Sequence, residues 1–196
     1  GSAFVLCDIP TDYSRAESYP LSECFNVAVV STFSPDEPLA EVLEAAAGLE
    51  DVQFYITGKK AYASPALLAS APANVHFTDF LPEESYYALL GSSHAVMCLT
   101  TRNDTMQRGA CEALSLGRPI ITSDWPLLRE VFSRGTIHVN NTPEAILAAV
   151  RRVQAEGEIL SAEMAGLRIH RGSLSRERVD QLKRLCERLE RERGAA

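Results

Sequence analysis

The sequence predicts a doubly wound α/β fold, in which a Rossmann-like, mostly parallel sheet carries helices on both faces. From Asn26 onward, short runs of β-forming residues alternate with longer helical patterns, as expected of repeated strand–helix units. The strand runs are almost continuously apolar instead of alternating between apolar and polar residues. Such runs are typical of parallel strands that are buried on both faces.

The expected elements follow one another in a regular order. Strands are expected at 27–31, 52–57, 75–80, 95–100, 119–123 and 136–139, and helices at 38–48, 64–71, 82–92, about 105–116, 126–132 and 142–157. Thr142 and Pro143 suit an N-cap and a first helical position. Gly48, Gly117 and Gly157 stand where three helices should end.

The chain is expected to divide into three parts. Residues 1–25 comprise a tag remnant, a short strand at 3–9 and an interdomain linker rich in polar and turn-forming residues. Residues 26–172 form the Rossmann-like domain. Residues 173–196 form a charged amphipathic helix, because the apolar residues Val179, Leu182, Leu185 or Cys186, and Leu189 recur at helical spacing among Arg and Glu residues.

Composition excludes several classes of function. The net charge of −7 and the pI near 5.2 argue against broad contact with nucleic-acid phosphates. The five cysteines are scattered without a Cys-x-x-Cys pair, so they encode neither a disulfide framework nor a zinc site and favour a reducing cytoplasm. Cys98 and Cys111 are expected in the core. No run is long and apolar enough to span a bilayer, and the first residues lack a secretory pattern.

The stretch from Leu99 to Trp125 carries the strongest candidate site. A polar loop leads into a helix expected to begin near Thr105, beyond the carboxyl end of a strand, where doubly wound sheets bind ligands. Backbone amides of Met106, Gln107 and Arg108 would face phosphate oxygens. Arg108 could add positive charge, and Gly109 would allow a ligand to approach the backbone closely.

Two carboxylates in this stretch have two interpretations each. Glu112 lies three residues after Gly109 and so on the same side of the helix, where it could accept hydrogen bonds from vicinal hydroxyls or simply be solvated. Asp104 could accept hydrogen bonds from hydroxyls of a ligand, or it could be an ordinary N-cap residue, a role for which Asn103 and Thr105 are also suited. The residue pattern alone does not choose between these interpretations.

The order of motifs from residue 26 to about 155 resembles the donor-binding, C-terminal domain of retaining GT-B glycosyltransferases of the family-4 type. In that family an acidic residue is followed after seven residues by Glu-Ala, then by a Gly-x-Pro turn and a strand ending near Ser-Asp. Asp104, Glu112–Ala113, Gly117–Arg118–Pro119 and Ser123–Asp124 stand at that spacing. The resemblance implies one half of a GT-B fold.

The resemblance also implies roles for particular residues. Glu112 would bind the ribose of a nucleoside diphosphate sugar, and Asp104 and Arg108 would act at the donor sugar and leaving group. Phe80 and Leu81 would lie near the base. The remaining nucleotide-sugar residues would be Met106, Gln107, Gly109, Thr32, Lys59 and Lys60.

Two departures from the family pattern concern the donor site. The first acidic residue is Asp104 where the family usually has Glu, so its carboxylate reaches less far. The loop 31–38 lacks the Gly-Arg and Lys residues that commonly point toward the diphosphate in enzymes of this family. Lys59 and Lys60 are the nearest substitutes by strand topology, although a solvated surface pair is the alternative interpretation.

The implied reaction is transfer of a sugar, of the hexosyltransferase type used in glycan biosynthesis, to an acceptor hydroxyl with retention. It would need no metal or other cofactor. By the resemblance, the acceptor-binding N-terminal domain is expected to lie outside this chain, so the fragment alone is expected to be inactive. The expected location is cytoplasmic, with attachment of a full-length parent to a membrane surface left open. The alternatives are a non-catalytic nucleotide- or protein-binding module and, ranked last, a nucleotide-sugar epimerase fragment.

Overall fold

Six parallel strands form one sheet in the computed structural model, which describes residues 10–13 and 18–194 of the 196-residue chain. The strands are β1 (Phe25–Val29), β2 (Val52–Thr57), β3 (Val75–Asp79), β4 (Ala95–Cys98), β5 (Ile120–Ser123) and β6 (Thr136–Val139). They lie in the order β3-β2-β1-β4-β5-β6, and every pair is parallel. The order therefore reverses between β1 and β4, which is the switch point where such sheets bind ligands.

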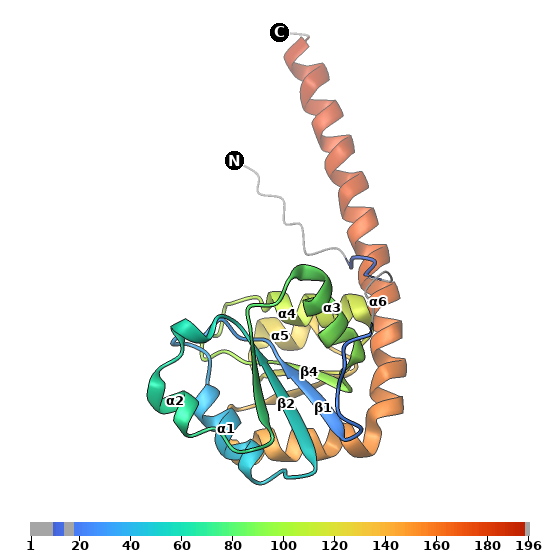
Figure 1. Ribbon diagram of the computed structural model, residues 1–196. Coiled ribbons are helices and arrows are strands. Elements are labelled where there is room, and N and C mark those ends of the chain that lie inside the picture. The colour runs from blue at the N-terminus through green and yellow to red at the C-terminus, as the bar shows by residue number, and fades with distance from the viewer. Residues whose placement is uncertain (1–9, 14–17, 195–196) are drawn as a thin grey trace.

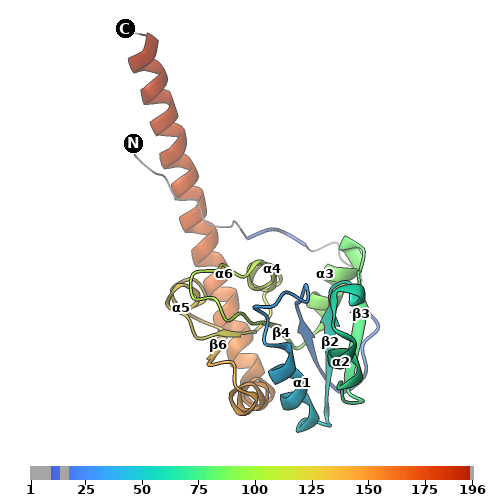
Figure 2. The same ribbon diagram turned by 90° about the vertical axis from the view of Figure 1, so that its left-hand side faces the viewer.

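Helices cover both faces of the sheet, which confirms the predicted doubly wound fold. They are α1 (Leu39–Ala47), α2 (Pro65–Ala69), α3 (Glu83–Ser92), α4 (Arg108–Leu116), α5 (Pro126–Val131) and α6 (Pro143–Gly194), with a short 3-10 helix, η1, at Lys60–Tyr62. The helices α1 and the first part of α6 lie on one face, and α3, α4 and α5 lie on the other (Figures 1 and 2).

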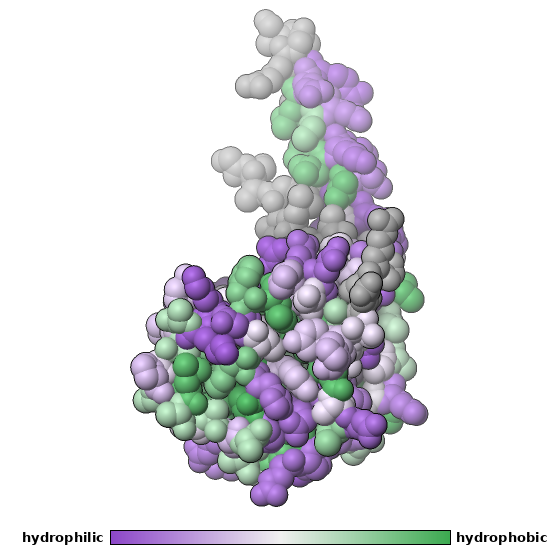
Figure 3. Space-filling view, viewed as in Figure 1, coloured by the Kyte–Doolittle hydropathy of each residue, from purple (hydrophilic) through white to green (hydrophobic). Residues whose placement is uncertain are grey.

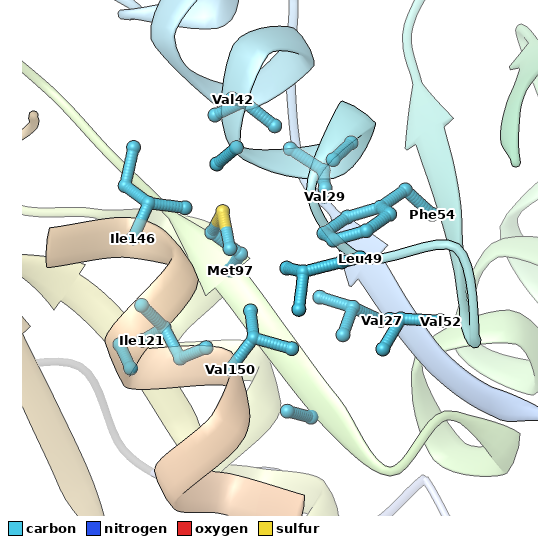
Figure 4. Close-up of a cluster of buried hydrophobic side chains, with 14 of the residues drawn as sticks. Val27, Val29, Val42, Leu49, Val52, Phe54, Met97, Ile121, Ile146 and Val150 are labelled. Atoms are coloured by element: carbon cyan, nitrogen blue, oxygen red, sulfur yellow. The ribbon is translucent and has the colours of Figure 1, made fainter. Parts of the chain in front are cut away.

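Two clusters of buried side chains hold the layers together. The first lies between the sheet and the helices α1 and α6, and Figure 4 shows Phe54, Met97 and Val150 meeting there. The second lies under α3, α4 and α5 and includes Val96, Ala110 and Phe132. Each fully buried Leu, Ile, Val or Phe side chain contributes roughly 1.5–3 kcal/mol of transfer free energy. The sheet is thus buried on both faces, as its continuous apolar strands require.

Cys98 belongs to the second cluster, as the sequence predicts. Its side chain is buried on β4, and burial, assisted by the charge of Glu112, raises the pKa of its thiol well above the ordinary value. A thiol with a raised pKa is a poor nucleophile, because the thiolate is the reactive form.

The helix α4 begins at Arg108, so its expected start near Thr105 is wrong. Gln107 is the N-cap residue, its backbone is extended, and it makes no side-chain cap hydrogen bond. The polar residues before it form a turn at Asn103 and Asp104 instead of capping the helix. Met106 therefore lies outside the helix and is 36% exposed, so its amide is not part of the first helical turn as expected.

The helix α6 runs from Pro143 to Gly194 without interruption, so the expected end at Gly157 is wrong. Its beginning is as predicted, because the amide of Ala145 donates to Thr142 Oγ1. Ile146 and Leu160 pack in the first cluster and Met164 in the second, on both sides of Gly157. Burial of these side chains outweighs the helix penalty of one glycine, which is about 1 kcal/mol.

Replacing Gly157 with alanine is expected to raise the free energy of unfolding by about 0.5–1 kcal/mol. A Cβ at this position would meet no atom within 4 Å, so alanine gains helix propensity without a steric cost. The measurement is urea unfolding followed by circular dichroism.

The matched control is Gly117→Ala at the end of α4, where φ is +69°. A Cβ there also meets nothing within 4 Å, but the left-handed conformation costs an L-residue roughly 1–2 kcal/mol. Destabilisation by Gly157→Ala would show that the helix is interrupted at this residue in solution.

The described parts of the N-terminal segment lie against the domain. The amide of Thr11 donates to Ser115 Oγ on α4, and that of Tyr19 donates to Ser92 Oγ on α3. Tyr19 and Leu21 pack against the second cluster. The strand expected at 3–9 lies outside the described residues. The division of the chain into domains at residues 25 and 172 stays a prediction.

The last part of α6 extends away from the sheet (Figures 1 and 2). It is hydrophobic along one side and hydrophilic along the other (Figure 3). Val179, Leu182 and Leu185 are half-buried, whereas Leu189 is exposed. In the residues that the structure describes, no helix combines the length and the apolar composition that a membrane-spanning segment requires.

Candidate functional site

A cavity of about 880 Å³ opens at the carboxyl ends of β1 and β2, beside the start of α4. It lies at the switch point between β1 and β4. Its size is within the range of small-molecule sites, roughly 300–1,000 Å³. The lining residues are Val30, Ser31, Thr32, Thr57, Gly58, Lys59, Tyr62, Phe80, Leu81, Glu83, Tyr86, Tyr87, Arg108, Gly109 and Glu112.

Glu112 brings a carboxylate into this cavity from α4. The residue is 7% exposed. The hydroxyl of Tyr86 donates to its Oε2 at 2.6 Å, and Nε of Arg108 donates to its Oε1 at 3.1 Å. Each carboxylate oxygen can accept a second hydrogen bond. Of the two positions that the sequence left open for Glu112, the structure has the one in the crevice and not the solvated one on the outer side of the helix.

Tyr86 is a site residue that the sequence analysis missed. It comes from α3, 26 positions before Glu112, and fixes one carboxylate oxygen by its short hydrogen bond. Burial, followed by the charge of Glu112, raises the pKa of its phenol far above the ordinary value, so the hydroxyl keeps its proton and donates. The pair of tyrosines in "ESYYALL" was the available signal, because tyrosines in a buried helix need hydrogen-bond partners.

Tyr86→Phe is expected to weaken the affinity for any ligand held by Glu112 by roughly 3- to 10-fold. The variant removes the donor that orients the carboxylate but keeps the ring. Nucleotide titration by calorimetry measures the effect. Tyr62→Phe is the matched control, because Tyr62 lines the same cavity and its hydroxyl has no hydrogen-bond partner among the described residues. Equal affinities of both variants would contradict the positioning role.

The start of α4 faces the cavity through Arg108 and Gly109. In the part of the chain that is described, the amides of these two residues have no hydrogen-bond partner, whereas the amide of Ala110 donates to Gln107 O. Free amides at a helix N-terminus attract anions. The first amides of the helix are those of residues 108 and 109, because α4 begins at Arg108, and Met106 and Gln107 precede the helix and do not line the cavity.

Gly109 is needed for packing as well as for access. A Cβ at this residue would lie 2.7 Å from Val30 Cγ1 and 2.9 Å from Cys98 Sγ. The absent side chain therefore allows α4 to approach β1 and β4 closely. From the sequence, close approach of a ligand was the only expected reason for a glycine at this position.

The cavity brings together seven of the residues that the sequence singled out. They are Thr32, Lys59, Phe80, Leu81, Arg108, Gly109 and Glu112. Four others do not line it: Asp104, Met106, Gln107 and Lys60. Asp104 is exposed in the turn before α4, and the backbone amide of Lys60 donates to Asp79 Oδ1.

The loop after β1 is held by a carboxylate of this chain. Oxygens of Glu37 accept hydrogen bonds from the hydroxyls of Ser31 and Thr32 at 2.6 and 2.8 Å and from the amide of Thr32 at 2.9 Å. Phe33 follows with φ of +59°, a strained conformation for a bulky residue. The loop thus supplies its donors to Glu37, and no basic residue of this loop lines the cavity.

The charges around the cavity balance one another. The lining residues include two basic side chains, Lys59 and Arg108, and two acidic ones, Glu83 and Glu112. Arg108 is paired with Glu112, which raises the pKa of its guanidinium. The ammonium of Lys59 lies 5.6 Å from the centroid of the Tyr62 ring and forms no ion pair with any described residue. Lys59 is therefore the cation of this cavity that is available to an anion.

In the described part of the chain, no three His, Cys, Asp or Glu side chains come together as a metal site would need. The expectation that the reaction needs no metal stays a prediction.

The fold and the cavity together define a Rossmann-like domain of the kind that forms one half of a GT-B glycosyltransferase. Its relatives belong to that class. Sucrose-phosphate synthase from Thermosynechococcus elongatus superposes with a TM-score of 0.68 at 16% identity, over 94% of this chain and 52% of that one. Anabaena HepE, solved with UDP and glucose, superposes with a TM-score of 0.66 at 14% identity, over 82% of this chain and 48% of that one. The pneumococcal O-GlcNAc transferase GtfA, solved with UDP and GlcNAc, superposes with a TM-score of 0.62 at 18% identity, over 93% of this chain and 38% of that one.

The chain belongs to the glycosyl transferase-like family, whose sequence model matches residues 37–184. It spans about half the length, or less, of the solved structures named above. No match was found among curated proteins.

Proposed function

We propose that this chain is the donor-binding half of a retaining glycosyltransferase and that its cavity holds a nucleoside diphosphate sugar. The observation that carries the proposal is the buried carboxylate of Glu112, fixed by Tyr86 and Arg108 inside a cavity at the switch point. A fixed carboxylate in this position suits the two hydroxyls of a ribose, as acidic residues do in other nucleotide-binding sheets.

The other parts of the donor are assigned around Glu112. The free amides of Arg108 and Gly109, with the ammonium of Lys59, would face the diphosphate and stabilise the charge that develops on it as it leaves. Phe80 is 78% exposed on the rim and, with Leu81, gives an apolar wall for the base. Asp104, four residues before Arg108, would reach the sugar only in a rearranged turn, because it lies outside the cavity.

The proposal leaves the acceptor to a domain outside this chain. All the site residues assigned here belong to the donor side, and the related structures are about twice as long or more. Transfer would then require the acceptor hydroxyl to be presented across the mouth of the cavity. The chain alone would bind donor nucleotide and transfer little. Retention at the anomeric carbon rests on the family resemblance.

A second candidate is a non-catalytic nucleotide- or protein-binding module of the same fold. The observation that favours it is Glu37, which takes up the hydrogen-bond donors of the loop after β1 and places a negative charge near the diphosphate position. Such a site would bind the nucleoside part more strongly than the phosphates.

Calorimetric titration of the chain with uridine, guanosine and adenosine diphosphates, and with the corresponding nucleosides, tests both candidates. A donor site is expected to prefer one base and to bind its diphosphate more tightly than its nucleoside. Equal binding of diphosphate and nucleoside supports the non-catalytic nucleotide module. Absence of binding to all six compounds contradicts the donor site and leaves a protein-binding module.

A further inference from the structure

A second cavity, of about 430 Å³, lies between the C-terminal end of α4 and the middle of α6. One face of α6 forms most of it, because Ala165, Arg168, Ile169, Gly172 and Arg176 recur at intervals of three and four residues. Gly117, the C-cap of α4, and Pro10 complete the lining. Small residues keep it open, since a Cβ at Gly117 would meet no atom within 4 Å. We refer to this cavity as the arginine pocket.

The arginine pocket is basic in a chain whose net charge is −7. Arg168 and Arg176 line it, and none of the described residues that line it is acidic. Within the described residues neither side chain forms an ion pair, although Arg176 Nη2 donates to Ser173 Oγ at 3.2 Å. Arg168 is half-buried and Arg176 is exposed. Two guanidinium groups without an ion-pair partner beside one cavity give it a positive potential that attracts an anion.

Arg118 is next to the arginine pocket in the sequence, although it is not one of the residues that line it. It directly follows the lining residue Gly117, and its Nε is buried without a hydrogen-bond partner. Burial lowers the pKa of this guanidinium, and no carboxylate offsets that effect. A buried donor on a charged group is costly to leave unsatisfied, and in native structures such an atom indicates a bound water or ion that completes it.

We propose that the arginine pocket binds the phosphoryl group of a small phosphorylated molecule. Guanidinium groups present paired N–H donors that match phosphate oxygens in a bidentate manner. The volume exceeds what a phosphate alone requires and lies within the range of small-molecule sites. Ile169 and Pro10 offer an apolar wall to the rest of the ligand. This proposal is independent of the donor site, which is lined by different residues.

The test is a nuclear magnetic resonance titration of the full chain with inorganic phosphate and, separately, with glucose 6-phosphate, at constant ionic strength. The amides of Gly117 and Gly172 report on the arginine pocket, and those of Gly58 and Gly109 report on the donor cavity. Saturable shifts at the first pair at millimolar or lower concentration are expected. Arg168→Gln combined with Arg176→Gln is expected to weaken them at least about tenfold, because each removes charge-assisted hydrogen bonds.

Two variants make the outcome specific. Lys59→Gln, in the donor cavity, should leave the shifts at Gly117 and Gly172 unchanged. Arg168→Lys keeps the charge without the paired donors and should weaken binding less than glutamine does. The proposal is overturned if Gly117 and Gly172 do not respond, if chloride shifts them equally, or if the Lys59 variant abolishes the response. Binding of inorganic phosphate with exclusion of glucose 6-phosphate would overturn the assignment to a phosphorylated organic molecule.

Discussion

Replacing Glu112 with glutamine is expected to weaken binding of the preferred nucleoside diphosphate by one to two orders of magnitude. A hydrogen bond to a charged acceptor contributes about 1.5–3 kcal/mol, and a ribose would donate two such bonds to this carboxylate. Glutamine keeps the shape of the side chain, but its N–H₂ group takes the place of one carboxylate oxygen that accepted hydrogen bonds. The side chain also loses its ion pair with Arg108. Calorimetric titration with the diphosphate that the wild-type chain prefers measures the change.

Glu83→Gln is the matched control for this prediction. Glu83 lines the same cavity and also carries a carboxylate, but it is exposed and makes no hydrogen bond or ion pair with another described residue. Its substitution should change affinity by less than about threefold, through screened long-range charge alone. If the two variants lose affinity equally, binding depends only on the net charge of the cavity, and Glu112 does not form hydrogen bonds to a ribose.

The fold could be predicted largely because its strands carry a simple signal. Runs such as "VAVVS" and "AVMCLT" are apolar without interruption, and burial on both faces of a parallel sheet is the condition that allows this. The order of strands and helices then follows from the alternation along the chain. The boundaries were less accurate where local signals compete. Asn103, Asp104 and Thr105 are all good capping residues, yet the helix starts at Arg108 without a side-chain cap.

The length of α6 shows a different limit. Gly157 looks like a helix end locally, but residues before it pack in the first cluster, and residues after it pack in both clusters. Packing partners distant in sequence decide whether a helix continues through a glycine, and the sequence does not display them. The same reasoning applies to Gly172, whose place in the arginine pocket depends on α4 lying opposite.

Helical spacing predicted the part of the site that lies on one helix, whereas Thr32, Lys59, Phe80 and Leu81 were expected from the family resemblance and from strand topology. Glu112 and Gly109 lie on one side of α4 by spacing, and both face the cavity. The partner of Glu112 is Tyr86, from another helix, and the loop after β1 is closed by Glu37. Neither contact follows from a repeat or a motif. The sequence did show that this loop lacks basic residues, and the structure adds the physical consequence, since the loop binds its own carboxylate in their absence.

Gly109→Ala is expected to lower the free energy of unfolding by about 1–3 kcal/mol, even though alanine is the better helix former by about 1 kcal/mol. The added Cβ would lie 2.7 Å from Val30 Cγ1 and 2.9 Å from both Val30 Cβ and Cys98 Sγ. Cys98 is 1% exposed and cannot withdraw, so α4 or Val30 must move. Either shift disturbs the wall of the donor cavity, because Val30 and Gly109 both line it. Urea unfolding measures the loss of stability.

Gly166→Ala separates this packing effect from helix propensity. Gly166 lies within α6 and is exposed, and a Cβ there would meet no atom within 4 Å, so alanine should stabilise the chain by about 0.5–1 kcal/mol. The two substitutions are chemically identical and should have opposite signs. If both stabilise, the helix and strands accommodate a methyl group at position 109. Gly109 would then be explained by ligand access, and Gly109→Ala should weaken nucleotide binding while leaving the fold intact.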